Sequence, residues 1–251
     1  MKLDLAGTTK RSIYLLVSLG LLCLLASVQQ CLAAERSEIL RYEVTWNGNK
    51  AGHGDITTKA GSKDVTVTVQ AVSDGVLKAI CEIWSQIQVT FSANGFKPKL
   101  YNYLLKSNLA GSESVGLVFD HKTDLVQIRK QKGKENESHC ETVRGAYDPV
   151  TAACLIRSQK DLSKPMFVDI YDGKDRTRLY VSPVCNEQIL VKAGPHPAVR
   201  LHLKLVKLGK QSEEIAQGAL WISNDANRIP LLLTSSPTLG TIRFELIHAQ
   251  L

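Results

Sequence analysis

Apolar and polar residues alternate with a period of two through most of the chain, and this alternation constrains the fold more than any other feature. Residues 40–46 place leucine, tyrosine, valine and tryptophan on one face, and Asn47 and Gly48 follow as a hairpin turn. Residues 65–71 and 83–91 repeat the pattern. Such segments predict antiparallel strands that pack one face and expose the other.

Helix signals are few. Asp148 followed by Pro149 is typical of a helix start, and residues 73–79 could form a second short helix. Residues 131–139 are hydrophilic and contain a glycine, which predicts an exposed loop. About a dozen strands with polar turns predict a mainly β fold. We expect a single domain built on a large curled antiparallel sheet, as an open barrel or a sandwich, with one or two short helices.

The first 34 residues have the layout of a secretory signal peptide. Lys10 and Arg11 precede an apolar run over residues 13–28, and small residues follow at positions 33–34. The run is at the lower margin of what spans a bilayer. This order of charge, apolar run and small residues predicts export.

We expect cleavage after Ala34, which would leave residues 35–251 as an exported β-rich domain with no membrane span. The periplasm is the expected compartment. An uncleaved N-terminal anchor is the alternative. A lipid anchor is disfavoured because Cys31 is preceded by Gln30 rather than by a small residue.

Charge and cysteine content exclude several classes of function. The net charge is +7, but the basic residues are dispersed apart from residues 129–134, which have no interleaved aromatics, so nucleic-acid binding is not expected. No metal or other cofactor is expected, because only His139 and Cys140 are close neighbours. Four cysteines follow the predicted signal, and their disulfide pairing is left open: Cys81, Cys140, Cys154 and Cys185.

Catalytic motifs are missing from the sequence. Gly111, Ser114 and Gly116 do not have the spacing of a nucleophile elbow, and the six histidines are scattered singly. Cys154 is the one candidate for a reactive thiol, since it lies near a predicted helix start, although a packed core thiol is the simpler interpretation. We therefore predict that the protein is not an enzyme.

Three stretches carry a family resemblance. They are Leu40-x-Tyr42-x-Val44-x-Trp46 with Gly48, Ala51 and Gly52; Tyr147-Asp148-Pro149-Val150-Thr151-Ala152-Ala153 with Ile156 and Arg157; and Gly218-x-Leu220-Trp221-Ile222-Ser223-x-Asp225-x-x-Arg228-Ile229-Pro230 with Gly240. Together they resemble a bacterial exported family known only as a domain of unknown function, DUF3108. The resemblance implies an envelope protein with a large antiparallel sheet, and it supplies no catalytic residues. The closing hairpin is also loosely similar to the sheets of periplasmic lipoprotein carriers, which hold acyl chains on a concave side.

Two functions are compatible with these features. The first is a non-catalytic envelope protein that binds a lipid or other apolar ligand in the concave side of its sheet. Candidate lining residues are Trp46, Trp84, Phe91, Trp221 and Leu233. Trp84 and Phe91 alternate to opposite faces, so at most one of them lines that side, and each candidate is otherwise an ordinary core residue. The second is a structural or assembly factor that contacts envelope proteins or glycans through sheet edges or the basic segment 129–134.

Overall fold

The computed structural model describes residues 36–209, 212–236 and 240–251, so the predicted signal peptide, residues 1–34, lies outside the described residues. Two short helices, α2 (Gly75–Ile80) and α3 (Pro149–Arg157), accompany fourteen strands. The strands are β1 (Arg36–Trp46), β2 (Asn49–Ala60), β3 (Asp64–Ser73), β4 (Ile83–Ser92), β5 (Pro98–Ser107), β6 (Gly111–Asp120), β7 (Leu125–Lys132), β8 (Glu135–Thr142), β9 (Met166–Tyr171), β10 (Arg176–Val191), β11 (Gly194–Lys207), β12 (Glu213–Ser223), β13 (Pro230–Ser235) and β14 (Ile242–Gln250).

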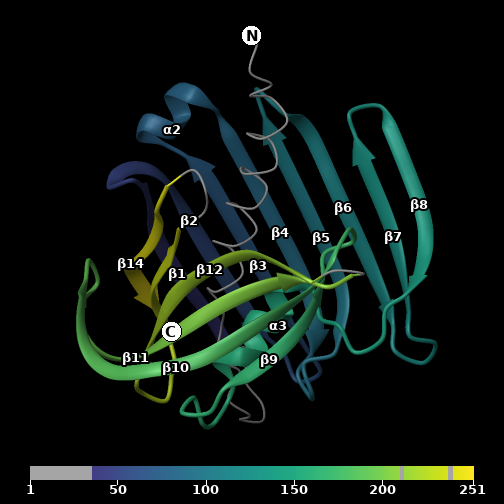
Figure 1. Cartoon of the computed structure of the whole chain (residues 1–251). Coiled ribbons are helices and arrows are strands. Elements are labelled where there is room, and N and C mark those ends of the chain that lie inside the picture. The colour runs from purple at the N-terminus through teal and green to yellow at the C-terminus, as the bar shows by residue number, and fades with distance from the viewer. Residues whose placement is uncertain (1–35, 210–211, 237–239) are drawn as a thin grey trace.

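All fourteen strands form one antiparallel sheet in the order β8-β7-β6-β5-β4-β3-β2-β1-β14-β13-β12-β11-β10-β9. The first and last strands of the chain's β region, β1 and β14, pair in the middle of this order and join two meanders. The sheet curls so that the meanders face one another, as Figure 1 shows. It is not closed, because β8 and β9 remain at its edges. The predicted single curled antiparallel sheet with short helices is confirmed.

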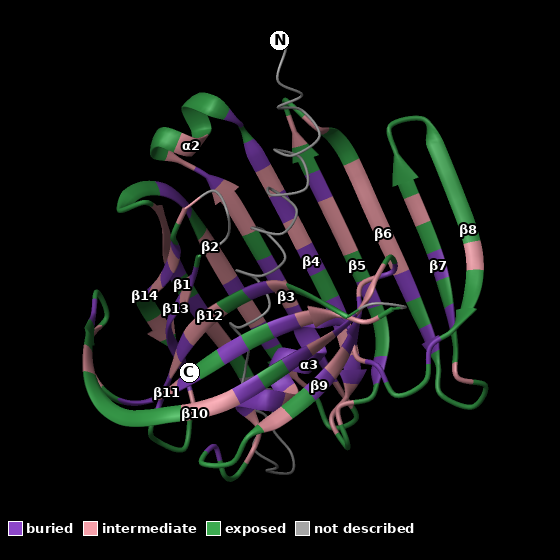
Figure 2. Cartoon of the chain, viewed as in Figure 1, coloured by how far each residue is buried: buried purple, intermediate pink, exposed green. Residues whose placement is uncertain are grey.

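Strand alternation assigns the two faces of the sheet. On β4 the odd-numbered residues from Ile83 to Phe91 are buried, while the residues between them are half-buried or exposed. The neighbouring strands keep the register, with Val89 opposite Val67 on one side and Tyr101 on the other. Figure 2 shows this alternation of burial along the strands. We call the face that carries these buried residues the inner face, because Val67, Val89 and Tyr101 share one core cluster with the residues of α3. The opposite face is the outer face.

The helix predicted at Asp148 is confirmed as α3. The Asp148 side chain accepts hydrogen bonds from the backbone N–H groups of Val150 and Thr151, at 3.0 and 2.8 Å, and Pro149 takes the first helical position. Every residue of α3 except Leu155 is buried. Neither helix in the described part of the chain is long and apolar enough to cross a membrane.

The loop predicted over residues 131–139 is wrong, because this segment forms the hairpin between β7 and β8. Gly133 adopts a φ of +59° at the turn, and β8 pairs with β7 along its whole length. Cross-strand pairs of opposite charge, Lys130 with Glu137 and Lys132 with Glu135, support the ladder. The alternation gave no signal because β8 has no apolar face: seven of its eight residues are exposed.

The two sheet edges approach one another at one end. Tyr147, which precedes α3, makes a parallel bridge with Ile170 of β9. The Tyr171 hydroxyl donates a hydrogen bond of 2.7 Å to the Glu141 carboxylate on β8. In the next turn, Gly173 has a φ of +89°, and a side chain there would collide with Leu117 on β6. These contacts join the two edges of the curled sheet, where no ladder of hydrogen bonds connects β8 with β9.

Candidate functional site

Three of the five candidate ligand-binding residues lie on the inner face. Phe91 and Leu233 are 0% and 1% exposed and belong to the main hydrophobic core. Trp46 is half-buried and packs against the same core near the end of β1. Phe91 stacks on Phe96, with ring centroids 5.6 Å apart, and Leu233 lines a void of about 10 Å³, which is room for about one water. Their present contacts are those of core residues.

The other two candidates, Trp84 and Trp221, lie on the outer face. The Lys106 ammonium lies 5.4 Å from the centroid of the Trp84 ring. The indole N–H of Trp221 donates to the Glu187 carboxylate at 2.7 Å, and the Arg200 guanidinium lies 5.0 Å from the ring centroid. Alternation turns both indoles away from the concave side, so they do not lie with the three inner candidates.

Helix α3 covers only one end of the inner face. It packs against β9 and β4, and Figure 1 shows it at the opposite end of the sheet from α2. A nine-residue helix is about 13 Å long, whereas the ten residues of β4 extend about 33 Å. Towards α2 the inner face carries a second, separate apolar cluster of Cys81, Ile83 and Leu105, against which Leu77 of α2 packs.

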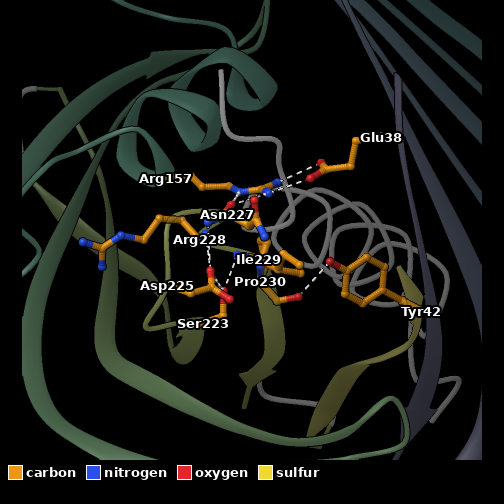
Figure 3. A network of polar contacts seen from close by, with 9 residues as sticks. All are labelled: Glu38, Tyr42, Arg157, Ser223, Asp225, Asn227, Arg228, Ile229 and Pro230. Carbon is orange, nitrogen blue, oxygen red and sulfur yellow. Dashed lines mark hydrogen bonds and ion pairs between the residues drawn. The ribbon is translucent and has the colours of Figure 1, made fainter. Parts of the chain in front are cut away.

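A buried ion pair anchors α3 to the sheet (Figure 3). Arg157 is 1% exposed, and its two terminal nitrogens donate to the two carboxylate oxygens of Glu38 on β1, at 3.0 and 2.7 Å. The same guanidinium donates to the backbone oxygen of Asn227, at 2.8 and 3.2 Å from two of its nitrogens. One side chain therefore joins α3, β1 and the turn between β12 and β13.

That turn is built by a second set of hydrogen bonds. The Asp225 carboxylate accepts from the Ser223 hydroxyl and from the N–H groups of Asn227 and Arg228, at 2.8 to 3.0 Å. The Ser223 hydroxyl in turn accepts from the Ile229 N–H at 2.7 Å. Together these bonds hold Arg228 at a φ of +51°. The turn is rigidly shaped and presents its Asn227 carbonyl to α3.

Tyr42 completes the network from β1. Its hydroxyl donates to the Pro230 carbonyl at 2.8 Å, at the start of β13. Burial raises the pKa of Tyr42 well above its ordinary value, so the phenol stays a donor. Because the polar groups of Tyr42, Glu38 and Arg157 are used in mutual or backbone contacts, the network is suited to holding the fold rather than to moving protons.

Asp148, the N-cap of α3, is a fully buried carboxyl group. Burial raises its pKa from 3.8 to about 6, although hydrogen bonds from Thr151 and Val150 act in the opposite direction. Its second oxygen accepts a short hydrogen bond from the Thr151 hydroxyl. The N–H groups at the start of α3 thus have a hydrogen-bond acceptor, but burial of the Asp148 carboxyl group costs desolvation free energy.

A cleft of about 260 Å³ lies near the start of α3, and its lining includes none of the five candidates. Its floor is apolar, with Phe119 and Val126 from β6 and β7 and Val143 and Ala146 from the segment before α3. His121 stands at its rim and bonds the Pro98 carbonyl. This volume is below the usual range for a drug-sized ligand, about 300 to 1,000 Å³.

The titratable side chains of the described ranges do not assemble a metal centre, since no three His, Cys, Asp or Glu side chains there are placed to hold an ion. His139 on β8 lies between Glu137 and Glu141, which are 3.1 and 3.0 Å from its two ring nitrogens. The four cysteines from Cys81 onwards, all within the described ranges, form no disulfide. Cys154 is buried in the main core, which agrees with the simpler interpretation of a packed thiol.

Fold and site together define a class of protein: an open, barrel-like single sheet whose concave side is capped at one end by an internal helix. The chain belongs to the family DUF3108, described as proteins of unknown function, whose model matches residues 41–247. The predicted resemblance is therefore confirmed. No curated protein matches the chain.

Solved structures are similar to the chain at low sequence identity, and the first of those named here shares its fold. A β-barrel-like protein of the domain of unknown function DUF1849 from Brucella abortus is 12% identical, with a TM-score of 0.61, over 85% of this chain and 97% of that one. A protein from Bacteroides fragilis described as exported, with a YmcC-like fold, is 10% identical over 91% and 100% of the two chains, with a TM-score of 0.38. A protein from Parabacteroides distasonis described as a lipoprotein is 10% identical over 88% and 100%, also with a TM-score of 0.38.

The three stretches that carry the family resemblance meet in the network of Figure 3. Tyr42 comes from the first stretch, Arg157 from the second, and the turn around Asp225 from the third. Sequence reasoning recognised these motifs but assigned them no role. It also missed Glu38, whose only signal is its position on the inner face of β1, opposite Thr58 of β2.

Proposed function

We propose that the protein is a non-catalytic, exported envelope protein that binds a lipid or another apolar envelope component on the concave side of its sheet. The N-terminal layout of residues 1–34 supports export, with the periplasm as the compartment. The observation that carries the binding proposal is the length of the apolar inner face, which continues past α3 to the second cluster near α2.

The physical argument rests on the apolar side chains of the inner face beyond α3. Each Å² of apolar surface removed from water is worth about 25 cal/mol, so an apolar concave face longer than its covering helix favours an apolar occupant. The inner positions at this end include Ile83 and Ile87 on β4 and Leu105 on β5, which are 5%, 3% and 1% exposed. Ser85 and Glu113 are the polar neighbours of Leu105 across the two ladders. A chain-like ligand could lie along the strands there, as in other sites lined by apolar side chains.

The alternative is a structural or assembly factor, and the edge strand β8 favours it. Its outer edge has no strand neighbour in the described sheet, and such an edge can pair with a strand of another protein. The carboxylates of Glu135, Glu137 and Glu141 lie on this strand. This function would leave the inner face as an ordinary core and predicts a protein partner in a pull-down.

The test is mass spectrometry of organic extracts from the purified exported protein. The full chain is expressed, and wild type is compared with Leu105→Gln on the inner face and with Leu100→Gln on the outer face of the same strand. We expect lipid at close to one molecule per protein in wild type and Leu100→Gln, and a clear loss in Leu105→Gln. Circular dichroism verifies that both variants are folded.

A wild-type extract free of lipid would contradict the proposal and leave the assembly factor ahead. Equal lipid content in the two variants would place any bound lipid elsewhere on the protein. In that case a pull-down with the β8 edge blocked by a proline at Ser138 would test the alternative, because proline cannot donate to an added strand.

A further inference from the structure

The end of the molecule at α2 exposes an unusual amount of apolar side chain. Val76 and Ile80 of α2 are 42% and 60% exposed, and Leu109 in the turn between β5 and β6 is 58% exposed. No residue of α2 is buried. The turn is fixed beside the helix end, since Glu82 and Asn108 exchange hydrogen bonds of 3.0 and 3.2 Å. We call Val76, Ile80 and Leu109 the α2 rim.

Apolar side chains gathered at one site indicate a docking surface, whereas single exposed ones are ordinary. The α2 rim is continuous with the inner face, because Leu77 of the same helix packs on the second cluster. An apolar path therefore leads from the exposed rim through Leu77 to Ile83 and Leu105. The rim lies at the end of the concave side that α3 does not cover (Figure 1).

The charges around the rim favour an anionic surface. Lys50 pairs with Asp74 at 2.6 Å, and Lys78 lies 3.8 Å from Glu82, so these charges compensate one another. Lys106 pairs with no carboxylate in the described chain and lies over the Trp84 ring. Lys106 therefore supplies a positive charge on the outer face at this end, while Glu113 lies opposite Leu105 on the inner face.

Lysine and tryptophan beside exposed aliphatic residues are the side chains that favour a membrane interface. The lysine stem lies along apolar surface while its ammonium reaches the headgroups, and the amphipathic indole occupies the boundary. A short helix that carries apolar residues to the outside can insert at that depth. The outward position of Trp84, which removes it from the concave side, is suitable for this contact.

We propose that the α2 rim docks on a lipid bilayer with anionic headgroups and so places the α2 end of the concave face against the membrane. This inference rests on the proposed function, to which it adds the surface from which the apolar ligand would come. Val76, Ile80 and Leu109 enter the interface, and Lys106 contacts the headgroup phosphates. A protein partner at the rim is the outcome that the test must exclude.

The test is flotation of the exported protein with two sets of vesicles. The anionic set contains phosphatidylglycerol and phosphatidylethanolamine, and the neutral set contains phosphatidylcholine alone. We expect the wild type to float with the anionic vesicles and Ile80→Glu to bind them at least about tenfold more weakly, because a charge replaces an inserted side chain. Lys106→Gln should weaken binding to anionic vesicles only. The matched control is Leu190→Glu, which changes a leucine that is 75% exposed at the far hairpin between β10 and β11 and should bind as wild type does.

Absence of wild-type flotation, or an equal loss in Ile80→Glu and Leu190→Glu, would overturn the docking proposal. Unchanged flotation of Ile80→Glu would do so as well. The test is independent of ligand binding, because lipid content is measured separately on the same protein. Lipid in the extract without vesicle binding refutes only the docking, and vesicle binding without lipid in the extract refutes only the proposed function.

Discussion

The two ends of the concave face are built differently. At the α3 end, a helix with eight of nine residues buried is held by Arg157, Glu38 and the Asp225 turn, and the family motifs converge there. At the α2 end, a helix with no buried residue stands beside a small separate apolar cluster. The comparison teaches that the helix at one end is buried and tied to the sheet by polar contacts, whereas the helix at the other end stays exposed and packs on the sheet through Leu77.

The largest effect should come from the buried ion pair at the closed end. Arg157→Ala leaves the Glu38 carboxylate without its partner, and we expect a loss of about 3 to 5 kcal/mol in the free energy of unfolding. Arg41→Ala is the control, because Arg41 and Asp55 form an exposed pair at 3.6 Å and should cost below about 1 kcal/mol. Guanidinium denaturation measures both. Similar losses in the two variants would mean that the network does not hold the closed end.

The two faces of β4 provide the next comparison. Phe91→Ala should cost about 3 to 5 kcal/mol, because it removes a fully buried aromatic side chain from the core. Trp84→Ala should cost about 1 kcal/mol, since Trp84 lies on the outer face and loses chiefly its contact with Lys106. Thermal and denaturant melts report both values. A larger loss for Trp84 would reverse the assignment of inner and outer faces.

The dependence of stability on pH tests the helix cap at the closed end. The folded pKa of Asp148 is about 6, above its ordinary 3.8, so the fold binds this proton more tightly than the unfolded chain does. Its contribution is therefore full below pH 4 and is lost as the pH rises through 6, by up to about 3 kcal/mol. Asp148→Asn keeps a capping side chain but should remove this loss.

Asp161 is the control for that measurement, because its contribution to stability changes with pH in the opposite direction. Hydrogen bonds from Ser163 lower the pKa of this exposed carboxylate, so its contribution is present above its unfolded pKa and is lost as the pH falls. Asp161→Asn should therefore leave the decline between pH 4 and 6 intact. Stability curves of wild type and Asp148→Asn that run parallel over this range would show that Asp148 is not buried as described.

The smallest expected effect concerns the seam between the sheet edges. Tyr171→Phe removes the hydrogen bond to Glu141 and should cost about 1 kcal/mol, while amide exchange in β8 becomes faster. Glu141→Gln keeps an acceptor oxygen and should have less effect. Hydrogen exchange in β8 that is equal in wild type and Tyr171→Phe would show that this contact does not hold the curl.

Local patterns in the sequence predicted much of this fold. Alternation predicted the strands, and Asp148 with Pro149 predicted α3. Strand β8 was missed because it has no apolar face, so apolar and polar residues do not alternate along it.

The candidate site was less predictable. Alternation separates Trp84 from Phe91, but which of them faces inward depends on how the sheet curls. The pairing of Arg157 with Glu38 joins residues 119 positions apart, so no local pattern reveals it. The α2 rim was also missed, because three apolar residues in a short helix and a turn form no recognisable motif.

Hydrogen exchange along the strands, in lipid-free and lipid-loaded protein, tests the central claim most directly. If an apolar ligand lies at the α2 end of the concave face, lipid should protect the amides of β4 and β5 around Ser85 and Leu105, which face one another across the ladder. The amides of α3 should stay unchanged, because that end is already packed. No added protection in β4 and β5, or protection confined to α3, would contradict the account.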